Sequence, residues 1–297
     1  MNISIQNLTK IYGNGHKALK SINLEIETGM FGLLGANGAG KSTLMRILVS
    51  LMQPTSGTIT INGHDLLKNR KAIRSMTGYL PQDFSAFPKL KTWEFLDYSA
   101  RMGGVKEKRK RRDAIDEMLE EVGLFEVRER YANQLSGGMK RRLGIAQALI
   151  GEPQIIIVDE PTTGLDPDER IRFRNLLTKI SSKDVIIILS THIVGDISST
   201  CTQMALLRSG NLLYTGSPEA LINMAKGKVW RIHASHEQFD EVNVKFNVIS
   251  TIPSVGGWDL EVVAETVNGY PAEIIEPNLE HAYVYFMEEK NKTLITR

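Results

Sequence analysis

The sequence has almost no cysteine and no long apolar segment. Cys201 is the single cysteine in 297 residues, which excludes a disulfide framework and a cysteine-based zinc site and fits a reducing compartment. The longest apolar runs, such as residues 185–189, have about a quarter of the ~20 residues that a helix needs to cross a bilayer. If the protein works at a membrane, we expect another chain to supply the membrane-spanning part. The first residues lack the apolar core of a signal peptide, so we expect no secretion.

An excess of charge of one sign is also lacking. The chain has 36 basic and 34 acidic residues and a formal net charge of +2 at pH 7, which gives no global reason to expect nucleic acid as a partner. One run, residues 106–112 (KEKRKRR), is locally basic and lies inside a helical periodicity that extends from residue 92 to about 123. It could contact nucleic acid or anionic lipid headgroups. Because no aromatic residues are interleaved, we favour a solvated helix face.

One short segment, by contrast, contains three closely spaced glycines. Residues 35–43 (GANGAGKST) follow an apolar run, 30–34, and precede a helix-forming run, 44–51. The segment matches the pattern G-x-x-x-x-G-K-S/T between a strand and a helix, where backbone amides and the helix N-terminus bind a polyphosphate. Lys41 would contact the β and γ phosphates, and the Ser42 hydroxyl would bind Mg²⁺. The alternative is a glycine turn beside a surface lysine. The predicted nucleotide-binding residues of this segment are Gly35, Ala36, Asn37, Gly38, Ala39, Gly40, Lys41, Ser42 and Thr43.

A small β layer is predicted beside this segment. Residues 3–5, 22–26 and 58–61 are rich in alternating apolar residues, which is typical of antiparallel strands, and the last is followed by the hairpin turn of Asn62 and Gly63. Tyr12 lies in this layer, and its ring could stack on a nucleotide base or be a half-buried ring at a strand end. Stacking does not read the identity of the base. No N-K-x-D element favours guanine, so we expect ATP.

Two later segments also have the composition of ligand sites. Residues 135–139 (LSGGM) precede a predicted helix, and a serine with paired glycines at a helix N-terminus favours either anion binding or an ordinary cap. Residues 155–160 (IIIVDE) are typical of a buried parallel strand that ends in a ligand crevice. Asp159 could hold Mg²⁺ through water. Glu160 could orient and deprotonate an attacking water, although both acids could also merely cap the next element.

A second apolar strand, residues 185–189, ends at Ser190, Thr191 and His192. Parallel strands end at the same edge of a sheet, so we expect His192 to lie near Glu160. There it could donate a hydrogen bond to the γ-phosphate and stabilise the charge that develops in phosphoryl transfer. A lone histidine usually has no such role, and only its place at a strand end favours one here.

In their order, these segments resemble the nucleotide-binding subunit of an ATP-binding cassette (ABC) transporter, over roughly residues 1–217. The resemblance implies that Glu160 is the catalytic base and that His192 is the switch histidine. It implies that Gln82 is the Q-loop glutamine, which senses Mg²⁺ and the membrane partner. It makes Tyr12 the aromatic that stacks on the base and residues 35–43 the Walker A loop. The implied Mg²⁺ contacts, partly through water, are Ser42, Gln82 and Asp159.

The resemblance also implies that two nucleotide-binding domains meet head to tail. ATP on the Walker A loop of one domain is then closed by the signature motif of the other, and hydrolysis releases the pair, a switch that can drive a membrane partner. The D-loop contributes Asp166. Met139 replaces the usual glutamine of the signature, which changes contacts across the dimer rather than ATP binding, because the serine and glycine amides do most of the phosphate binding. The signature residues are Ser136, Gly137, Gly138 and Met139.

We therefore predict an α/β fold: a P-loop NTPase core with a mostly parallel sheet, an antiparallel β subdomain and a helical signature subdomain at about residues 83–152. Residues 218–297 are predicted to form a small α+β appendage, either regulatory or steadying the dimer. Its predicted strands and helix are residues 229–234, 245–251, 258–264 and 276–290. Residues 277–280 (PNLE) resemble the P-x-L-E-D segment that ends many export-type (ABC-2-like, drug or antibiotic-resistance) subunits, with His281 in place of the acid.

The predicted function is that of an ATPase subunit that powers export by a separately encoded permease at the cytoplasmic face of the cell membrane. We expect ATP and Mg²⁺ as cofactors and a second nucleotide-binding subunit as partner, as a homodimer or a heterodimer, and no nucleic acid. The alternative is a soluble ABC ATPase that acts on ribosomes or nucleic acid. Such proteins usually carry two cassettes or a long coiled-coil insertion, and neither is present. A P-loop kinase or GTPase would leave residues 136–139 and His192 without a role.

Overall fold

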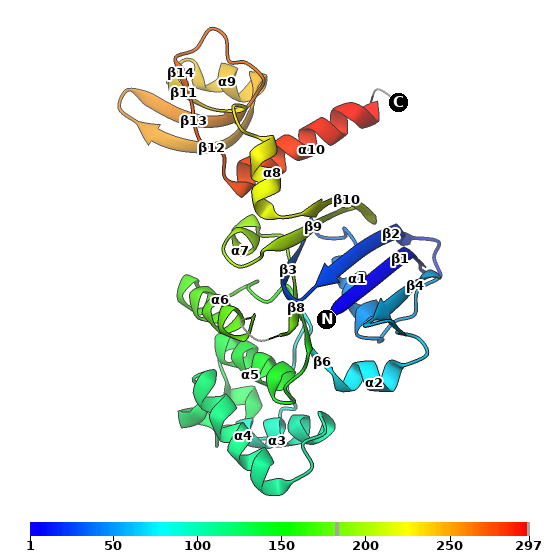
Figure 1. The fold of residues 1–297 in the computed structure, drawn as a ribbon. Coiled ribbons are helices and arrows are strands. Elements are labelled where there is room, and N and C mark those ends of the chain that lie inside the picture. Colours follow the sequence, from blue (N-terminus) through cyan, green and yellow to red (C-terminus); the bar gives the residue numbers. More distant parts are fainter. Residues whose placement is uncertain (182–183, 296–297) are drawn as a thin grey trace. The chain divides into compact units, whose positions relative to one another are not determined.

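The computed structural model describes residues 1–181 and 184–295, and the chain divides into two compact units, Met1–Thr215 and Gly216–Arg297 (Figure 1). Unit 1 contains two sheets. The smaller has the strand order β2-β1-β4-β5 and the larger has the order β10-β9-β3-β8-β7-β6. The strands of the smaller sheet are β1 (Asn2–Ile11), β2 (Lys17–Glu27), β4 (Ser56–Ile61) and β5 (His64–Asp65). The strands of the larger sheet are β3 (Gly29–Leu34), β6 (Thr77–Leu80), β7 (Ile155–Asp159), β8 (Ile186–Thr191), β9 (Gln203–Arg208) and β10 (Asn211–Gly216).

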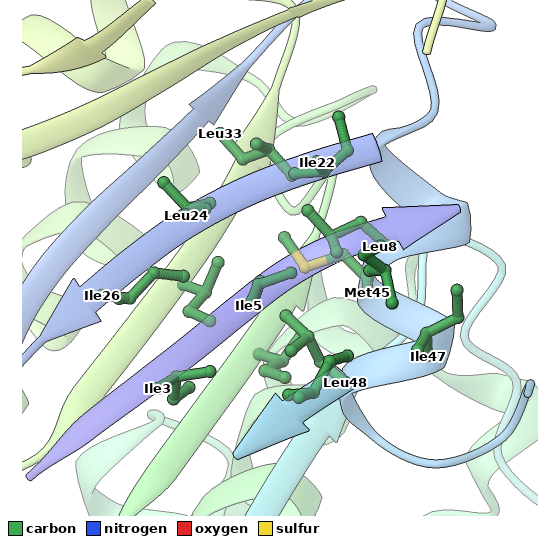
Figure 2. Packing of buried hydrophobic residues seen from close by; sticks show 14 of the residues in the cluster. Ile3, Ile5, Leu8, Ile22, Leu24, Ile26, Leu33, Met45, Ile47 and Leu48 are labelled. Carbon is green, nitrogen blue, oxygen red and sulfur yellow. The ribbon is translucent and has the colours of Figure 1, made fainter. Parts of the chain in front are cut away.

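The smaller sheet is antiparallel where β1 pairs with β2 and β4, as its alternating sequence predicts. The β4–β5 hairpin turns at Asn62 and Gly63, both with positive φ (48° and 78°), a geometry that the Asn-Gly pair adopts readily. Figure 2 shows the apolar side chains of this sheet against the helix that follows β3. Its buried residues include Ile3, Ile5 and Leu24, which share one core cluster with Met45.

The larger sheet is parallel where β3 pairs with β8 and β9, and where β7 pairs with β6 and β8. All residues of β7 and β8 are buried, which explains their continuous apolar sequences. Leu34 is in register with Thr191, and Asp159 with Ser190. The segments that follow β3, β7 and β8 therefore begin at one edge of the sheet.

The helices of unit 1 include a separate group, α3 to α5 (Figure 1). This group packs around its own apolar cluster, in which Leu96, Leu119 and Leu143 are fully buried. The continuous helical periodicity predicted from residue 92 to about 123 is wrong in one respect, because the structure has two helices there. Gly103 and Gly104 separate them, and Gly104 has a φ of 97° that a helix cannot contain. The helices of unit 1 are α1 (Lys41–Leu48), α2 (Arg70–Ser75), α3 (Thr92–Met102), α4 (Lys108–Glu121), α5 (Gly137–Leu149), α6 (Pro167–Ser181) and α7 (Val194–Ser198).

The basic run at the start of α4 is exposed except for one residue. Arg111 is 4% exposed, and its guanidinium pairs with Asp97 at 2.5 Å and donates to the carbonyls of Val105 and Lys106. The interpretation of this run as a solvated face is therefore wrong for Arg111, whose buried charge is fully paired.

Unit 2 is an α+β unit with a four-stranded sheet in the order β12-β13-β11-β14. Its core contains Ile232, Val242 and Leu260, and α8 packs beside α10. The sequence did not predict α9 or β14. The last helix begins at Leu279 because the Asn278 side chain accepts the backbone N–H groups of residues 280 and 281. The elements are α8 (Pro218–Met224), β11 (Val229–Ser235), α9 (Phe239–Lys245), β12 (Asn247–Ser254), β13 (Gly257–Val263), β14 (Ala272–Ile274) and α10 (Leu279–Ile295). Among the described residues of the whole chain, no helix combines the length and apolarity that a bilayer crossing requires.

Candidate active site

The segment after β3 forms the wall of a cavity of about 280 Å³ at the edge where the parallel strands end. The cavity brings together residues that are far apart in the sequence. Most of the predicted nucleotide-binding residues line it, together with Gln82 and Glu160. The lining residues are Tyr12, His16, Ala18, Asn37, Gly38, Ala39, Gly40, Lys41, Ser42, Thr43, Gln82 and Glu160. Gly35 and Ala36 are not among them, and their carbonyl oxygens accept hydrogen bonds from Lys41.

The backbone of this loop adopts a conformation that requires glycine. Gly40 has a φ of 110°, and a Cβ atom there would lie 2.5 Å from the carbonyl oxygen of Ala18. Gly38 also has a positive φ, 78°, but the space around it is open. With α1 beginning directly after Gly40, backbone N–H groups and a helix N-terminus surround the cavity, which is a geometry that fits a polyphosphate.

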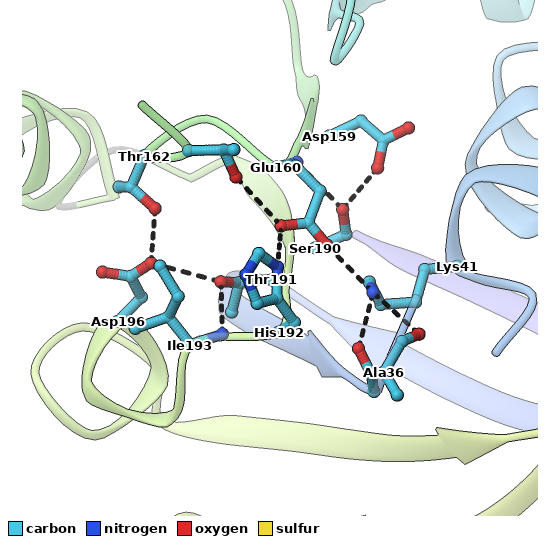
Figure 3. Close-up of polar contacts among 12 residues, drawn as sticks. Ala36, Lys41, Asp159, Glu160, Thr162, Ser190, Thr191, His192, Ile193 and Asp196 are labelled. Atoms are coloured by element: carbon cyan, nitrogen blue, oxygen red, sulfur yellow. Dashed lines mark hydrogen bonds and ion pairs between the residues drawn. The ribbon is translucent and has the colours of Figure 1, made fainter. Parts of the chain in front are cut away.

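Lys41 is buried at the base of the loop, with 5% of its surface exposed. Its Nζ donates to the carbonyl oxygens of Gly35 at 2.6 Å and Ala36 at 3.3 Å. It also forms an ion pair of 2.9 Å with Oε1 of Glu160 (Figure 3). A buried ammonium group is unfavourable without an anionic partner, so this position of Lys41 calls for a negative charge.

Glu160 lies between a cation and an imidazole. Its side chain is 4% exposed, and Oε2 lies 2.7 Å from Nδ1 of His192 and accepts a hydrogen bond of 3.3 Å from the Thr163 hydroxyl. The Glu160 backbone has a φ of 49°, which is uncommon for a residue with a side chain. A carboxylate held in this way at the rim of a phosphate-binding cavity has the geometry of a general base.

Asp159 and His192 adjoin Glu160 rather than line the cavity. Ser190 joins the two acids, because its hydroxyl donates to Oδ1 of Asp159 at 2.5 Å and accepts the Glu160 N–H at 3.1 Å. The sequence prediction that the ends of β7 and β8 bring Glu160 and His192 together matches this arrangement (Figure 3).

A buried carboxylate that we did not predict supports the two loops. Asp196, 4% exposed, accepts hydrogen bonds from the hydroxyls of Thr162 at 2.5 Å and Thr191 at 3.2 Å (Figure 3). Thr191 in turn accepts the N–H of Ile193 at 2.9 Å. These contacts fix the segments on either side of His192. The sequence did hold one signal for this support. Each of the two threonines lies within two or three residues of an acid or histidine at a strand end.

Tyr12 and Ser42 lie on the walls of the cavity. The Tyr12 hydroxyl is 3.0 Å from the Thr43 hydroxyl, and its ring stacks on the imidazole of His16 with an interplanar angle of 16°. His16 was not predicted, because an exposed histidine in a turn has no distinguishing pattern. Ser42, Gln82 and Asp159 offer a hydroxyl, an amide and a carboxylate, which are the hard oxygen donors that Mg²⁺ takes in small number while it keeps its waters.

The signature residues and the D-loop aspartate do not line this cavity in the part of the chain that the structure describes. Ser136 is exposed and caps α5, since its hydroxyl accepts the Met139 N–H at 3.2 Å. The Met139 side chain packs against the apolar cluster of α3 to α5. Asp166 is exposed and accepts the N–H of Glu169 at 2.9 Å in the first turn of α6. This set of residues therefore does not serve the cavity of its own chain.

Arg141 is a further residue that the sequence did not indicate. It extends from α5 to the backbone carbonyls that follow β6 and β7, including that of Glu160. Burial lowers the pKa of its guanidinium, and the carboxylates of Asp159, Asp83 and Glu160 oppose that shift.

Comparison with known proteins gives one consistent result. A family profile described as "ABC transporter" matches residues 19–163. The chain is 37% identical over 235 residues to the uncharacterized ABC transporter ATP-binding protein YxlF of Bacillus subtilis (strain 168), covering 77% of this chain and 76% of that protein. It is 37% identical over 213 residues to the bacitracin transport ATP-binding protein BcrA of Bacillus licheniformis, covering 71% of this chain and 68% of that protein.

A solved structure agrees with these relatives. The dimeric ATP-binding cassette MJ0796, in a post-hydrolysis state with ADP and Pi, is 28% identical and has a TM-score of 0.67. The similarity covers 72% of this chain and 98% of that structure.

Proposed function

The chain belongs to the ABC transporter family as an ATP-binding and ATP-hydrolysing subunit, and from this premise we propose that it powers export through a separate membrane-spanning subunit. The observation that carries the proposal is the contact of Glu160 with both Lys41 and His192 at the rim of the glycine loop, residues 35–43. This arrangement combines a phosphate-binding cation with a base for water. The site residues all lie in unit 1, which leaves residues 218–297 an accessory role.

In this proposal, the loop amides and Lys41 bind the triphosphate, and Tyr12 stacks on the adenine. Ser42, Gln82 and Asp159 would hold Mg²⁺, which would neutralise phosphate charge. Glu160 accepts a proton from the attacking water. His192 orients Glu160 through Nδ1 and stabilises the charge on the reacting phosphate.

We also assign the site to a dimer. Ser136 and Gly137 are exposed at the N-terminus of α5 and do not line the cavity of their own chain. They remain available to a nucleotide on a second copy, and the similar cassette MJ0796 is dimeric. A homodimer needs no other chain for this contact, so we propose one.

The membrane partner would dock in a second cavity, of about 750 Å³, next to the first. Exposed apolar side chains line it, among them Phe87 (52% exposed), Tyr98 (48%) and Met102 (73%). Grouped apolar side chains at a surface are typical of a binding site for another protein. Gln82 lines both cavities, so a partner here would contact a residue of the ATP site.

Export is the proposed direction because residues 277–280 resemble the closing segment of export-type subunits. The relative BcrA, which is named for bacitracin transport, agrees with a role in transport. The protein would then act at the cytoplasmic face of the cell membrane, held there by its partner.

The test is to purify the tagged full chain from detergent-solubilised membranes and to identify the proteins that come with it. We expect a multi-spanning membrane protein. Ribosomal proteins in its place would favour the soluble alternative. Phe87→Asp should abolish the association without loss of ATP binding. The matched control is Tyr131→Asp, which adds the same charge at an aromatic residue that is 45% exposed and does not line the second cavity.

A further inference from the structure

The guanidinium of Arg141 uses its full hydrogen-bonding capacity on backbone carbonyls. An arginine side chain has five N–H donors in a fixed plane, and Arg141 makes one contact with each of five carbonyl oxygens. Nε donates to Pro161 at 2.9 Å. Nη1 donates to Pro81 at 3.2 Å and Gln82 at 2.9 Å. Nη2 donates to Asp159 at 3.1 Å and Glu160 at 2.7 Å.

These acceptors belong to two segments that begin where neighbouring strands end. Pro81 and Gln82 follow β6, Asp159 is the last residue of β7, and Glu160 and Pro161 follow it. Arg141 itself lies in the second turn of α5, five positions after Ser136, the residue that caps this helix. One side chain therefore joins the helix of the signature residues to the backbone of both Gln82 and Glu160.

The Glu160 backbone needs such support. Its φ of 49° lies in the left-handed region, which costs a residue with a side chain about 1–3 kcal/mol and persists only where the surroundings enforce it. The contacts with Asp159, Glu160 and Pro161 hold the three carbonyls around this turn in one orientation. Lysine has the same charge but only three donors on a single atom, so it cannot make this set of contacts.

We propose that Arg141 is a positioning residue for hydrolysis, which keeps Glu160 and Gln82 in their working geometry only while α5 is in place. Arg141 does not line the ATP cavity, so it acts through these two residues. A displacement of Ser136 then moves the backbone of the catalytic base in the same chain. This inference depends on the proposed ATPase function.

The test compares the steady-state ATPase kinetics of the full chain with those of Arg141→Lys. We expect kcat to fall ~100-fold, because small displacements of a catalytic group have effects of that size. KM and the affinity for a fluorescent ATP analogue should stay within about threefold of the wild type, because the loop and Lys41 are untouched. Arg141→Gln has fewer hydrogen-bond donors and lacks the positive charge, and it should behave in the same way.

The matched control is Arg111→Lys, which removes another buried guanidinium that donates to two backbone carbonyls, far along the chain from the site. Its kcat should stay close to that of the wild type. The inference is overturned if both Arg141 variants keep wild-type kcat. It is equally overturned if they lose nucleotide binding or melt at a much lower temperature than Arg111→Lys, because Arg141 would then hold the fold rather than the base. If the wild type itself hydrolyses no ATP, the proposed function fails instead.

Discussion

The Glu160 carboxylate contacts two groups with different proton chemistry, the Lys41 ammonium at 2.9 Å and the His192 imidazole at 2.7 Å. The ammonium is the group that phosphate oxygens attract most strongly, and the imidazole can donate or accept a hydrogen bond. Both contacts are made by one side chain that is almost completely buried.

Glu160→Gln should keep ATP binding and lose turnover. The amide has nearly the same shape but cannot accept the proton of the attacking water, so kcat should fall by at least about 100-fold. Size-exclusion chromatography with ATP and Mg²⁺ should show a persistent dimer. Glu129→Gln is the control, because Glu129 is 65% exposed and does not line the cavity, and its kcat should not change. Undiminished hydrolysis by Glu160→Gln would remove Glu160 from the mechanism.

Cys201 should make the fold sensitive to strongly alkaline solution. Burial raises the pKa of its thiol from about 9 to about 12. The folded chain therefore holds this proton more tightly than the unfolded chain, so the contribution is complete below pH ~9 and is lost as the pH rises towards 12. Between these two pH values, the free energy of unfolding should fall by about 1.4 kcal/mol per pH unit because of this thiol. Urea unfolding of the wild type and of Cys201→Ala should differ in pH slope by this amount above pH 9 and not below.

The positions of site residues at strand ends were predictable from the sequence. The contacts of a long side chain that extends to other segments were not. Lys41, Glu160 and His192 follow three parallel strands, and the rule that such strands end at one edge was enough to place them together. Arg141 lies inside a helix with basic neighbours, and nothing in its spacing shows that its side chain crosses to two other segments. The roles assigned to these residues remain predictions.

At the scale of the element, the glycine loop between β3 and α1 tolerates no side chain at one position. Gly40→Ala should lower both the melting temperature and the affinity for ATP. The new Cβ would lie 2.5 Å from the Ala18 carbonyl at a φ of 110°, so the cost should exceed the ~1–3 kcal/mol of backbone strain alone. Gly38→Ala is the matched control in the same loop, because only strain applies where nothing lies within 4 Å. Equal melting temperatures for the two variants would contradict this account.

Elements with a clear period were predicted, and short or interrupted ones were not. The alternation in β1 and β2 and the apolar runs of β7 and β8 identified these strands from sequence alone. The helix α9 and the strand β14 were missed because each is too short to show a period. Gly103 and Gly104 also break a helical pattern that otherwise continues on both sides.

At the scale of the whole molecule, the signature residues do not line the cavity of their own chain, and the head-to-tail dimer that we propose would make the active site a shared one. Lys41→Ala protein and Ser136→Arg protein should each be inactive, and an equal mixture should recover about a quarter of the wild-type ATPase activity. Half of the dimers are then mixed, and each has one intact site.

The control is an equal mixture of two single variants, Lys41→Ala protein and Glu160→Gln protein. Both residues serve the same half of a site, so no mixed dimer has an intact one and the mixture should stay inactive. Recovery in the control, or none in the test mixture, would contradict a head-to-tail dimer.

The ion pair between Lys41 and Glu160 has a consequence for timing. In the structure, Oε1 of the carboxylate is occupied by its ion pair with the Lys41 ammonium. A phosphate that draws the ammonium to itself releases the carboxylate at that moment. If Glu160 is the base that we propose, the arriving triphosphate itself makes the carboxylate available, whereas ligands with too little negative charge leave the ion pair intact.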